Sequence, residues 1–362
     1  MADPPPKSPE PPGSGREDPS QDEARALPGI GLPERLAGSG ALDRLVETAR
    51  GYAAQATAAA TRRAYAADWA RFARWARRRG AALLPPDPQL VGLYVADCAA
   101  GGPSPALSVA SIERMLSGLA FGYRARGAVL DRSDRHIAQV LAGVRRAHGT
   151  PPFQKAAVSA EEVLAMAATL AFDLRGLRDR ALLLLGFAAG TRRAELVGLD
   201  CARDDTPDGR GWIEVEDAGV LLTLKGKTGW REIEVGRGSS ERSCPVQALE
   251  TWLAFGKVDL GPVFRRVSQD GTRTLDARLS DRHVARLVKQ TVLAAGLRPD
   301  LPEAERLALY SGHSLRAGLA SHALVDEAAV QKHLGHASAE MTRRYQRRRD
   351  RYRVNLTKAA GL

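Results

Sequence analysis

The stretch LRDRALLLLGFAAGTRRAELVGL, residues 177–199, sets the fold class of the second half of the chain. Its long apolar run predicts a buried helix that ends at Gly190. A new helix begins with Arg192 and Arg193, and Glu195 follows three residues after Arg192. An arginine held at a helix start by a carboxylate suits phosphate binding, because the guanidinium and the helix N-terminus both attract anions. An ordinary surface ion pair explains this stretch alone equally well.

After this stretch the sequence changes to the alternating pattern of strands. GWIEVEDAGVLLTLKGKTGWREIEVG, residues 211–236, alternates apolar and polar residues around glycine-containing turns, which predicts a small antiparallel sheet. Lys225 and Lys227 fall at a hairpin tip, from which a lysine can reach a bound ligand, although such lysines are usually solvated. After CPVQALETWLAFG, residues 244–256, the chain returns to helices. Residues 159–362 are therefore predicted to form a mostly helical α+β domain.

Before this stretch, residues 41–148 are predicted to form an all-helical domain. In TRRAYAADWARFARWARRRG, residues 61–80, four aromatic residues recur at spacings of three and four along a basic helix. We expect these rings in the core rather than stacked on bases. The arginines form either a solvated face or, given their density, contacts to phosphates. The aromatic residues are Tyr65, Trp69, Phe72 and Trp75, and the arginines assigned to phosphate contact are Arg62, Arg63 and Arg71.

Proline-rich segments separate the predicted domains. Residues 1–40 combine proline, glycine, serine and charge, which predicts a disordered tail. Residues 149–158 are predicted to be a linker, because Pro151 and Pro152 favour an extended chain. Ser159 and Glu162 have the spacing of a capping box and predict the start of the next helix.

The composition restricts the class of protein. The net charge of +11 and the isoelectric point near 9.9 favour a polyanionic partner such as nucleic acid, although alanine- and arginine-rich chains are also common in G+C-rich genomes. No stretch reaches the ~18 apolar residues of a membrane span, and the N-terminus has no signal-peptide pattern. Cys98, Cys201 and Cys244 are far apart, which argues against a disulfide framework or a thiolate zinc site and fits the cytoplasm.

Two further stretches contain candidate site residues. In SGHSLRAGLASHAL, residues 311–324, His313 and Arg316 share one helix face and would supply donors and positive charge to an oxyanion or phosphorane. In HLGHASAEMTRRYQRRRDRYR, residues 333–353, a metal site would need His333, His336 and a third ligand. Carboxylates are few there and the cations would repel a metal. Tyr345 is a candidate nucleophile, because cationic neighbours favour the phenolate.

Taken in order, these motifs resemble the tyrosine recombinase (phage integrase) family. They read R-x-x-E, a hairpin lysine, H-x-x-R, and L-G-H followed nine residues later by tyrosine. The resemblance covers about residues 41–355 and looks most like the simple Cre- and Xer-type enzymes. It implies a SAM-like helical core-binding domain before the catalytic domain. It also implies site-specific DNA recombination, in which strands are cleaved, exchanged and rejoined through a 3′-phosphotyrosine.

The resemblance also implies the roles of the site residues. Tyr345 would attack the scissile phosphate, Lys227 would be the general acid, and two arginines would clamp the nonbridging oxygens. Glu195 would orient the site without touching the DNA. No metal or other cofactor is implied, because the phosphotyrosine stores the bond energy. The residues that match the family's catalytic set are Arg192, Lys227, His313, Arg316, His336 and Tyr345.

The implied partners are double-stranded DNA recombination sites and further copies of the same chain. We expect a homotetramer on two DNA sites, in the cytoplasm at the nucleoid and away from any membrane. In the family, a C-terminal segment docks on the neighbouring subunit, which is an expectation for the basic end of this chain. Arg343 and Arg344 are expected to contact DNA.

Several alternatives stay open at the level of sequence. The chain could be a type IB topoisomerase, which uses nearly the same chemistry, or a non-catalytic DNA-binding regulator with a decayed site. A metal-dependent nuclease is a third alternative, but it would need a carboxylate cluster that the sequence lacks. Lys225 competes with Lys227, and Tyr352 competes with Tyr345 although its offset from L-G-H is too long by seven. Tyr310 is expected to be structural. His333 is expected to be a helix-surface residue.

Overall fold

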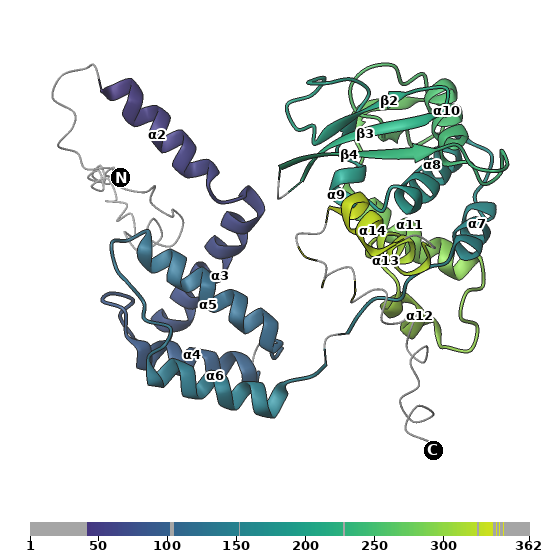
Figure 1. The fold of residues 1–362 in the computed structure, drawn as a ribbon. Coiled ribbons are helices and arrows are strands. Elements are labelled where there is room, and N and C mark those ends of the chain that lie inside the picture. The colour runs from purple at the N-terminus through teal and green to yellow at the C-terminus, as the bar shows by residue number, and fades with distance from the viewer. Residues whose placement is uncertain are drawn as a thin grey trace, which may run out of the picture. The chain divides into compact units, whose positions relative to one another are not determined.

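The computed structural model describes residues 42–335 except 102–104, 152, 227–228 and 324–325, together with Ser338, Glu340 and Arg343. The chain divides into two compact units, Met1–Pro152 and Phe153–Leu362 (Figure 1). The division lies within the segment 149–158. The last part of that segment packs on the second unit, since the Ala156 amide donates to the Leu309 carbonyl and Val158 is fully buried.

The described part of the first unit is helical. Its helices are α2 (Asp43–Gln55), α3 (Ala59–Arg77), α4 (Pro88–Ala100), α5 (Val109–Arg124) and α6 (Arg135–His148). Helix α3 packs on α5, and α4 packs on α6. Trp69, Phe72 and Trp75 lie in the core, which confirms the prediction for these three rings, whereas Tyr65 is half-buried. Gly122 of α5 allows the close approach of α3, because a Cβ there would lie 2.3 Å from Cε3 of Trp69.

Over its described residues, the second unit combines helices with two small sheets. Its helices are α7 (Ala160–Ala168), α8 (Leu174–Ala188), α9 (Arg193–Leu196), α10 (Pro245–Gly256), α11 (Asp281–Ala294), α12 (Glu303–Leu309), α13 (His313–His322) and α14 (Glu327–Leu334). Its strands are β1 (Leu199–Asp200), β2 (Gly211–Val215), β3 (Gly219–Gly226), β4 (Gly229–Gly236), β5 (Arg265–Val267) and β6 (Thr274–Arg278). The Ser159–Glu162 capping box opens α7 as predicted.

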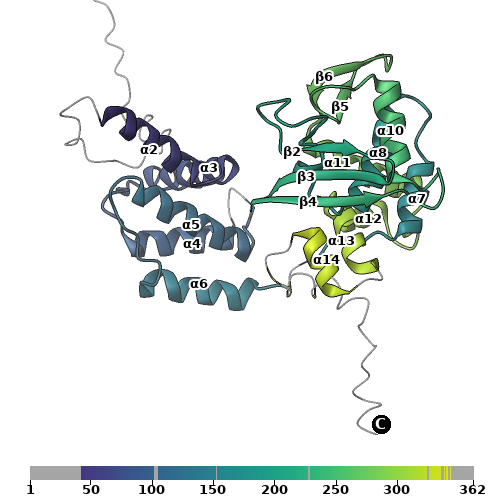
Figure 2. The same ribbon diagram turned by 45° about the horizontal axis from the view of Figure 1, so that its top comes forward.

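Strands β1 to β4 form one sheet in chain order, with β1 parallel to β2 and the other pairs antiparallel. Figure 2 shows β2, β3 and β4 side by side near α8 and α10. Leu222 and Leu224 of β3 and Ile233 and Val235 of β4 belong to the same core cluster as the leucines of α8. The predicted fold class, mainly helical with a small antiparallel sheet, is confirmed.

The prediction that the chain returns to helices after α10 is wrong in one place. Strands β5 and β6 form a short antiparallel hairpin between α10 and α11. The strands are short and rich in arginine, so they lack the apolar alternation that marks a half-buried strand. The sequence nevertheless contains a hairpin-turn signal, because Asp270 is followed by Gly271, which has a φ of +78°.

Candidate active site

The junction of α8 and α9 fixes the first candidate arginine. Gly190 ends α8 with a φ of +58°, and a Cβ there would lie 2.5 Å from Cδ2 of Leu334. The chain then turns so that Arg192 caps α9. Its Nη1 donates to Oε1 of Glu195 at 2.7 Å, and its backbone amide donates to Oε2 at 2.9 Å. The carboxylate therefore holds both the main chain and the side chain of this arginine.

The Glu195 carboxylate is buried and ionised. The residue is only 4% exposed. Burial by itself would raise its pKa, but hydrogen bonds from Arg231 and Arg192 and the charge of Arg231 lower the pKa to about 2. The predicted Arg-x-x-Glu pair thus joins a buried carboxylate to a partly exposed guanidinium.

Helix α13 supplies the next two candidates, His313 at its first turn and Arg316 one turn later. Arg316 is 2% exposed. Its Nη1 donates to the Gly190 carbonyl at 2.6 Å, and its Nη2 donates to the Leu334 carbonyl at 2.7 Å. One guanidinium thus joins α13, the turn before Arg192 and the end of α14. Figure 2 shows α13 and α14 as neighbouring helices.

His313 lies within the electrostatic reach of three arginines. Partial loss of solvent around the imidazole lowers its pKa, and the charges of Arg316, Arg192 and Arg193 lower it further. Arg193 also packs against Gly312, where a Cβ would lie 2.3 Å from its Cδ. A histidine in such surroundings is neutral at physiological pH and can accept a proton.

The expectation that His333 is a helix-surface residue is wrong. It lies on α14 and is half-buried, with Nε2 3.1 Å from the carbonyl oxygen of Ala188 at the end of α8. Burial lowers its pKa, although hydrogen bonding to this backbone opposes the shift. The apolar pattern of α14 could not identify a carbonyl at the end of another helix as the partner. Tyr310, expected to be structural, is 2% exposed and lies in the core.

Arg231 on β4 is a residue that the sequence analysis missed. Its Nη2 donates to Oε2 of Glu195 at 2.9 Å, and its Nη1 donates to Oε1 at 3.3 Å. Glu195 therefore lies between two arginines, one from α9 and one from the sheet. The arginine follows the lysine hairpin by only a few residues, but nothing in its neighbours indicates a carboxylate more than thirty positions earlier.

The described residues bring Arg192, Glu195, His313 and Arg316 together. Lys227, His336, Tyr345 and Arg344 lie outside the described residues, as does Tyr352. Gly335, which directly precedes His336 in the chain, ends α14 with a φ of +61°. Lys225 is exposed near the tip of the β3–β4 hairpin, with Nζ 5.7 Å from the centre of the Trp230 ring.

The arginines predicted to contact DNA are divided between the units. Arg63 and Arg71 are exposed on α3 and Arg62 is half-buried there. Arg343 forms an ion pair with Glu327 of α14, with Nε 2.9 Å from Oε1. A contact from Arg343 to DNA would therefore compete with a carboxylate.

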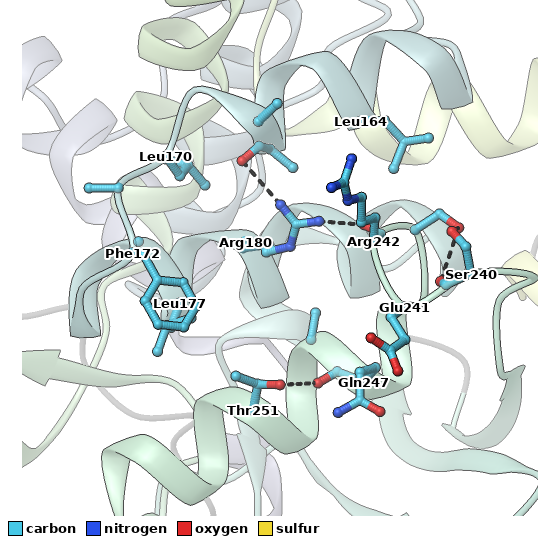
Figure 3. Close-up of a pocket in the computed structure, with 16 residues that line it drawn as sticks. Leu164, Leu170, Phe172, Leu177, Arg180, Ser240, Glu241, Arg242, Gln247 and Thr251 are labelled. Atoms are coloured by element: carbon cyan, nitrogen blue, oxygen red, sulfur yellow. Dashed lines mark hydrogen bonds between the residues drawn. The ribbon is translucent and has the colours of Figure 1, made fainter.

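A separate pocket of about 890 Å³ lies between α7, α8 and the start of α10 (Figure 3). Arg180 reaches across it and donates to the carbonyls of Ala167 and Arg242. None of the candidate catalytic residues lines this pocket. Over the described ranges, no three or more His, Cys, Asp or Glu side chains are grouped so that they could hold a metal ion. Among the described helices, none is both long and apolar enough to cross a membrane.

Comparison with known proteins gives matches over the same region. Residues 157–351 match the profile described as the phage integrase family. An integrase/recombinase XerD homolog from Selenomonas ruminantium is 29% identical over 301 residues, which are 79% of this chain and 80% of that protein. Tyrosine recombinase XerC 1 from Ralstonia nicotianae is 30% identical over 215 residues, which are 55% of this chain and 58% of that protein.

A solved structure shares the fold. The XerH site-specific recombinase, in a post-cleavage complex with a palindromic difH substrate, superposes with a TM-score of 0.56 at 18% sequence identity. The superposition covers 83% of this chain and 79% of that one. At this identity the likeness concerns the fold.

Proposed function

This chain belongs to the phage integrase family, and from that premise we propose that it is a tyrosine site-specific recombinase. It cleaves and rejoins double-stranded DNA through a 3′-phosphotyrosine and exchanges strands between two sites. The observation that carries the proposal is the grouping of Arg192, His313 and Arg316 in the described part of the chain, with Arg192 held by the buried Glu195 carboxylate. Such a cluster suits the negative charge of a phosphoryl transition state.

In this mechanism, Tyr345 is the nucleophile. Its phenol gives a proton to His313 while its oxygen forms a bond to phosphorus, and the lowered pKa of His313 keeps the imidazole neutral and able to accept that proton. The bond from phosphorus to the 5′ oxygen breaks, and Lys227 gives that oxygen a proton. The 5′-hydroxyl of a partner strand reverses these steps on the phosphotyrosine, so the joining step needs no outside energy.

Arg192 and Arg316 bind the nonbridging oxygens in the proposed mechanism, and His336 donates a further hydrogen bond. Glu195 supports the rigidity of Arg192, because it accepts from both its backbone and its side chain. A preorganised donor stabilises the transition state better than a mobile one, since no rearrangement is needed as charge develops.

The proposed working assembly is a homotetramer on two DNA sites at the nucleoid in the cytoplasm. The exposed arginines of α3, Arg63 and Arg71, contact phosphates together with Arg62, and the C-terminal segment docks on the neighbouring copy. Relaxation of DNA by a type IB topoisomerase is the competing activity, and it would need only one site.

The test begins with a DNA site selected from a random duplex library by binding to the Tyr345→Phe variant. The selected duplex is then nicked next to the cleavage position and incubated with the wild-type chain in EDTA. We expect a covalent protein–DNA adduct that Tyr345→Phe does not form. An adduct that persists in this variant would refute the assignment of the nucleophile. Plasmids with one or two sites then separate relaxation from recombination.

A further inference from the structure

Arg231 on β4 contacts three segments of the second unit at once. It pairs with Glu195, and its guanidinium packs against Gly226 at the end of β3 and against Gly335 at the end of α14. Each of these segments holds, or directly precedes, one residue of the proposed catalytic set. We propose that Arg231 is a positioning residue that holds the three segments in register for DNA cleavage. This inference rests on the proposed recombinase function.

The first contact acts on Arg192. Glu195 is shared between Arg192 Nη1, at 2.7 Å from Oε1, and the two terminal nitrogens of Arg231. A bidentate guanidinium fixes the plane of the carboxylate and not merely its position. Without Arg231, the Glu195 side chain could rotate, and the direction in which it holds Arg192 would change with it.

The second contact acts on the lysine hairpin. A Cβ placed on Gly226 would lie 2.9 Å from Nη1 of Arg231, so the guanidinium already lies against this backbone. Gly226 directly precedes Lys227 in the chain. Arg231 therefore supports the hairpin at the residue next to the proposed general acid.

The third contact acts on the turn after α14. A Cβ on Gly335 would lie 2.8 Å from Cδ, 3.1 Å from Nε and 3.4 Å from Cζ of Arg231. The backbone of Gly335, at a φ of +61°, thus packs against the Cδ methylene and the guanidinium of Arg231. His336 directly follows Gly335 in the chain. Nε of Arg231 is buried and has no hydrogen-bond partner within the part of the chain that the structure describes.

An ordinary buried ion pair would not also contact two further segments that lead to proposed catalytic residues. A comparison is Arg237, which directly follows β4 and pairs with Glu250 of α10 at 2.7 Å. That pair is more exposed than the Arg231–Glu195 pair, and its residues have no role in the proposed mechanism. It is therefore a matched Arg–Glu pair for control experiments.

The experiment measures single-turnover cleavage of the nicked duplex by Arg231→Gln, Arg231→Lys and the control Arg237→Gln. We expect Arg231→Gln to lower the rate constant about 10- to 100-fold, the size of effect that small misplacements of catalytic groups produce. The Kd for the intact duplex, measured by gel shift, should stay within about twofold, since the lost interaction acts on alignment and not on DNA contact. Arg231→Lys should recover part of the rate, and Arg237→Gln should cleave like the wild type.

A double-substitution cycle with Glu195→Gln tests whether Arg231 acts through the carboxylate. If it does, the double variant will be little slower than the slower single variant, because both remove the same support. Fully additive losses, or a Kd that rises with the loss of rate, would overturn the positioning role in favour of a direct phosphate contact. Wild-type cleavage by Arg231→Gln would also overturn it.

Two outcomes are separated by controls. If Arg231→Gln loses its cooperative thermal unfolding, Arg231→Lys is compared with the wild type instead. A folded Arg231→Lys variant lacks the bidentate pairing, so an unchanged cleavage rate in it would overturn the positioning role. If the wild-type chain itself forms no Tyr345-dependent adduct, the proposed function fails first, whereas an active wild type with an equally active Arg231→Gln refutes only the positioning role.

Discussion

Replacing Glu195 with glutamine should destabilise the second unit in a way that depends on pH. Glu195 is 4% exposed, its carboxylate accepts from Arg192 and Arg231, and its pKa falls from the ordinary 4.5 to about 2. A tenfold change in proton affinity corresponds to ~1.4 kcal/mol, so the ionised carboxylate contributes about 3 kcal/mol to the free energy of unfolding. Removing one partner from a buried ion pair typically costs about 3–5 kcal/mol, which agrees.

The sign of the pH dependence follows from the lowered pKa. Above pH 4.5 the carboxylate is ionised in both the folded and the unfolded chain, and its full contribution is present. As the pH falls from 4.5 towards 2, the unfolded chain takes up a proton before the folded chain does, and the contribution is lost. Glutamine carries no charge at any pH. The difference between wild type and Glu195→Gln should therefore shrink across this window.

Urea unfolding followed by circular dichroism at pH 7, 5, 4 and 3 measures this difference. Glu250→Gln, which removes the more exposed partner of Arg237, is the control and should have a smaller effect. A Glu195→Gln variant whose stability at pH 7 lies within about 0.5 kcal/mol of wild type, the range of ordinary surface substitutions, would refute the reasoning. So would a difference that stays constant from pH 5 to pH 3.

Three further predictions follow from single positions. Gly122→Ala should destabilise the first unit by about 1–3 kcal/mol, because the added methyl group would overpack against Trp69. The control Gly143→Ala has open space around it in α6 and should be neutral or stabilising by up to about 1 kcal/mol in the same urea titration. Gly335→Ala, at a φ of +61°, should slow cleavage of the nicked duplex about tenfold, and an unchanged rate would contradict the tight packing of that turn. Burial lowers the pKa of His333 in the folded chain, so the unfolded chain takes up the proton first and the wild type should lose stability as the pH falls below 6.5. His333→Gln should make this loss less steep. An equally steep loss in the variant would assign the effect to other groups.

Local patterns predicted the parts of the fold that depend on neighbouring residues. The aromatic stripe of α3 follows the helical period, and one face of a helix enters the core. The Arg192–Glu195 pair is three residues apart and forms one turn. The strand alternation of residues 211–236 likewise appears as β2, β3 and β4. In each case the interaction partner, or the core-facing side, is set within a few residues.

Contacts between distant segments could not be predicted in this way. The partner of Arg231 is 36 positions away, and that of His333 is 145 positions away. No periodicity encodes such distances, because they are set by how α8, α14 and the sheet pack together. Two glycines mark positions where such contacts between segments occur. Gly190 and Gly335 both have positive φ and both contact a side chain from another segment.

Arg316 explains why these distant contacts matter for the proposed chemistry. Its hydrogen bonds to the carbonyls of Gly190 and Leu334 satisfy buried acceptors that would otherwise be costly, so the residue stabilises the unit in addition to its proposed contact with the phosphate. A lysine has no planar fork with which to reach both carbonyls in the same way. Loss of activity on substitution of Arg316 would therefore mix a structural loss with a chemical one. Arg192, with a side chain that is 38% exposed and held by one carboxylate, separates the two effects better.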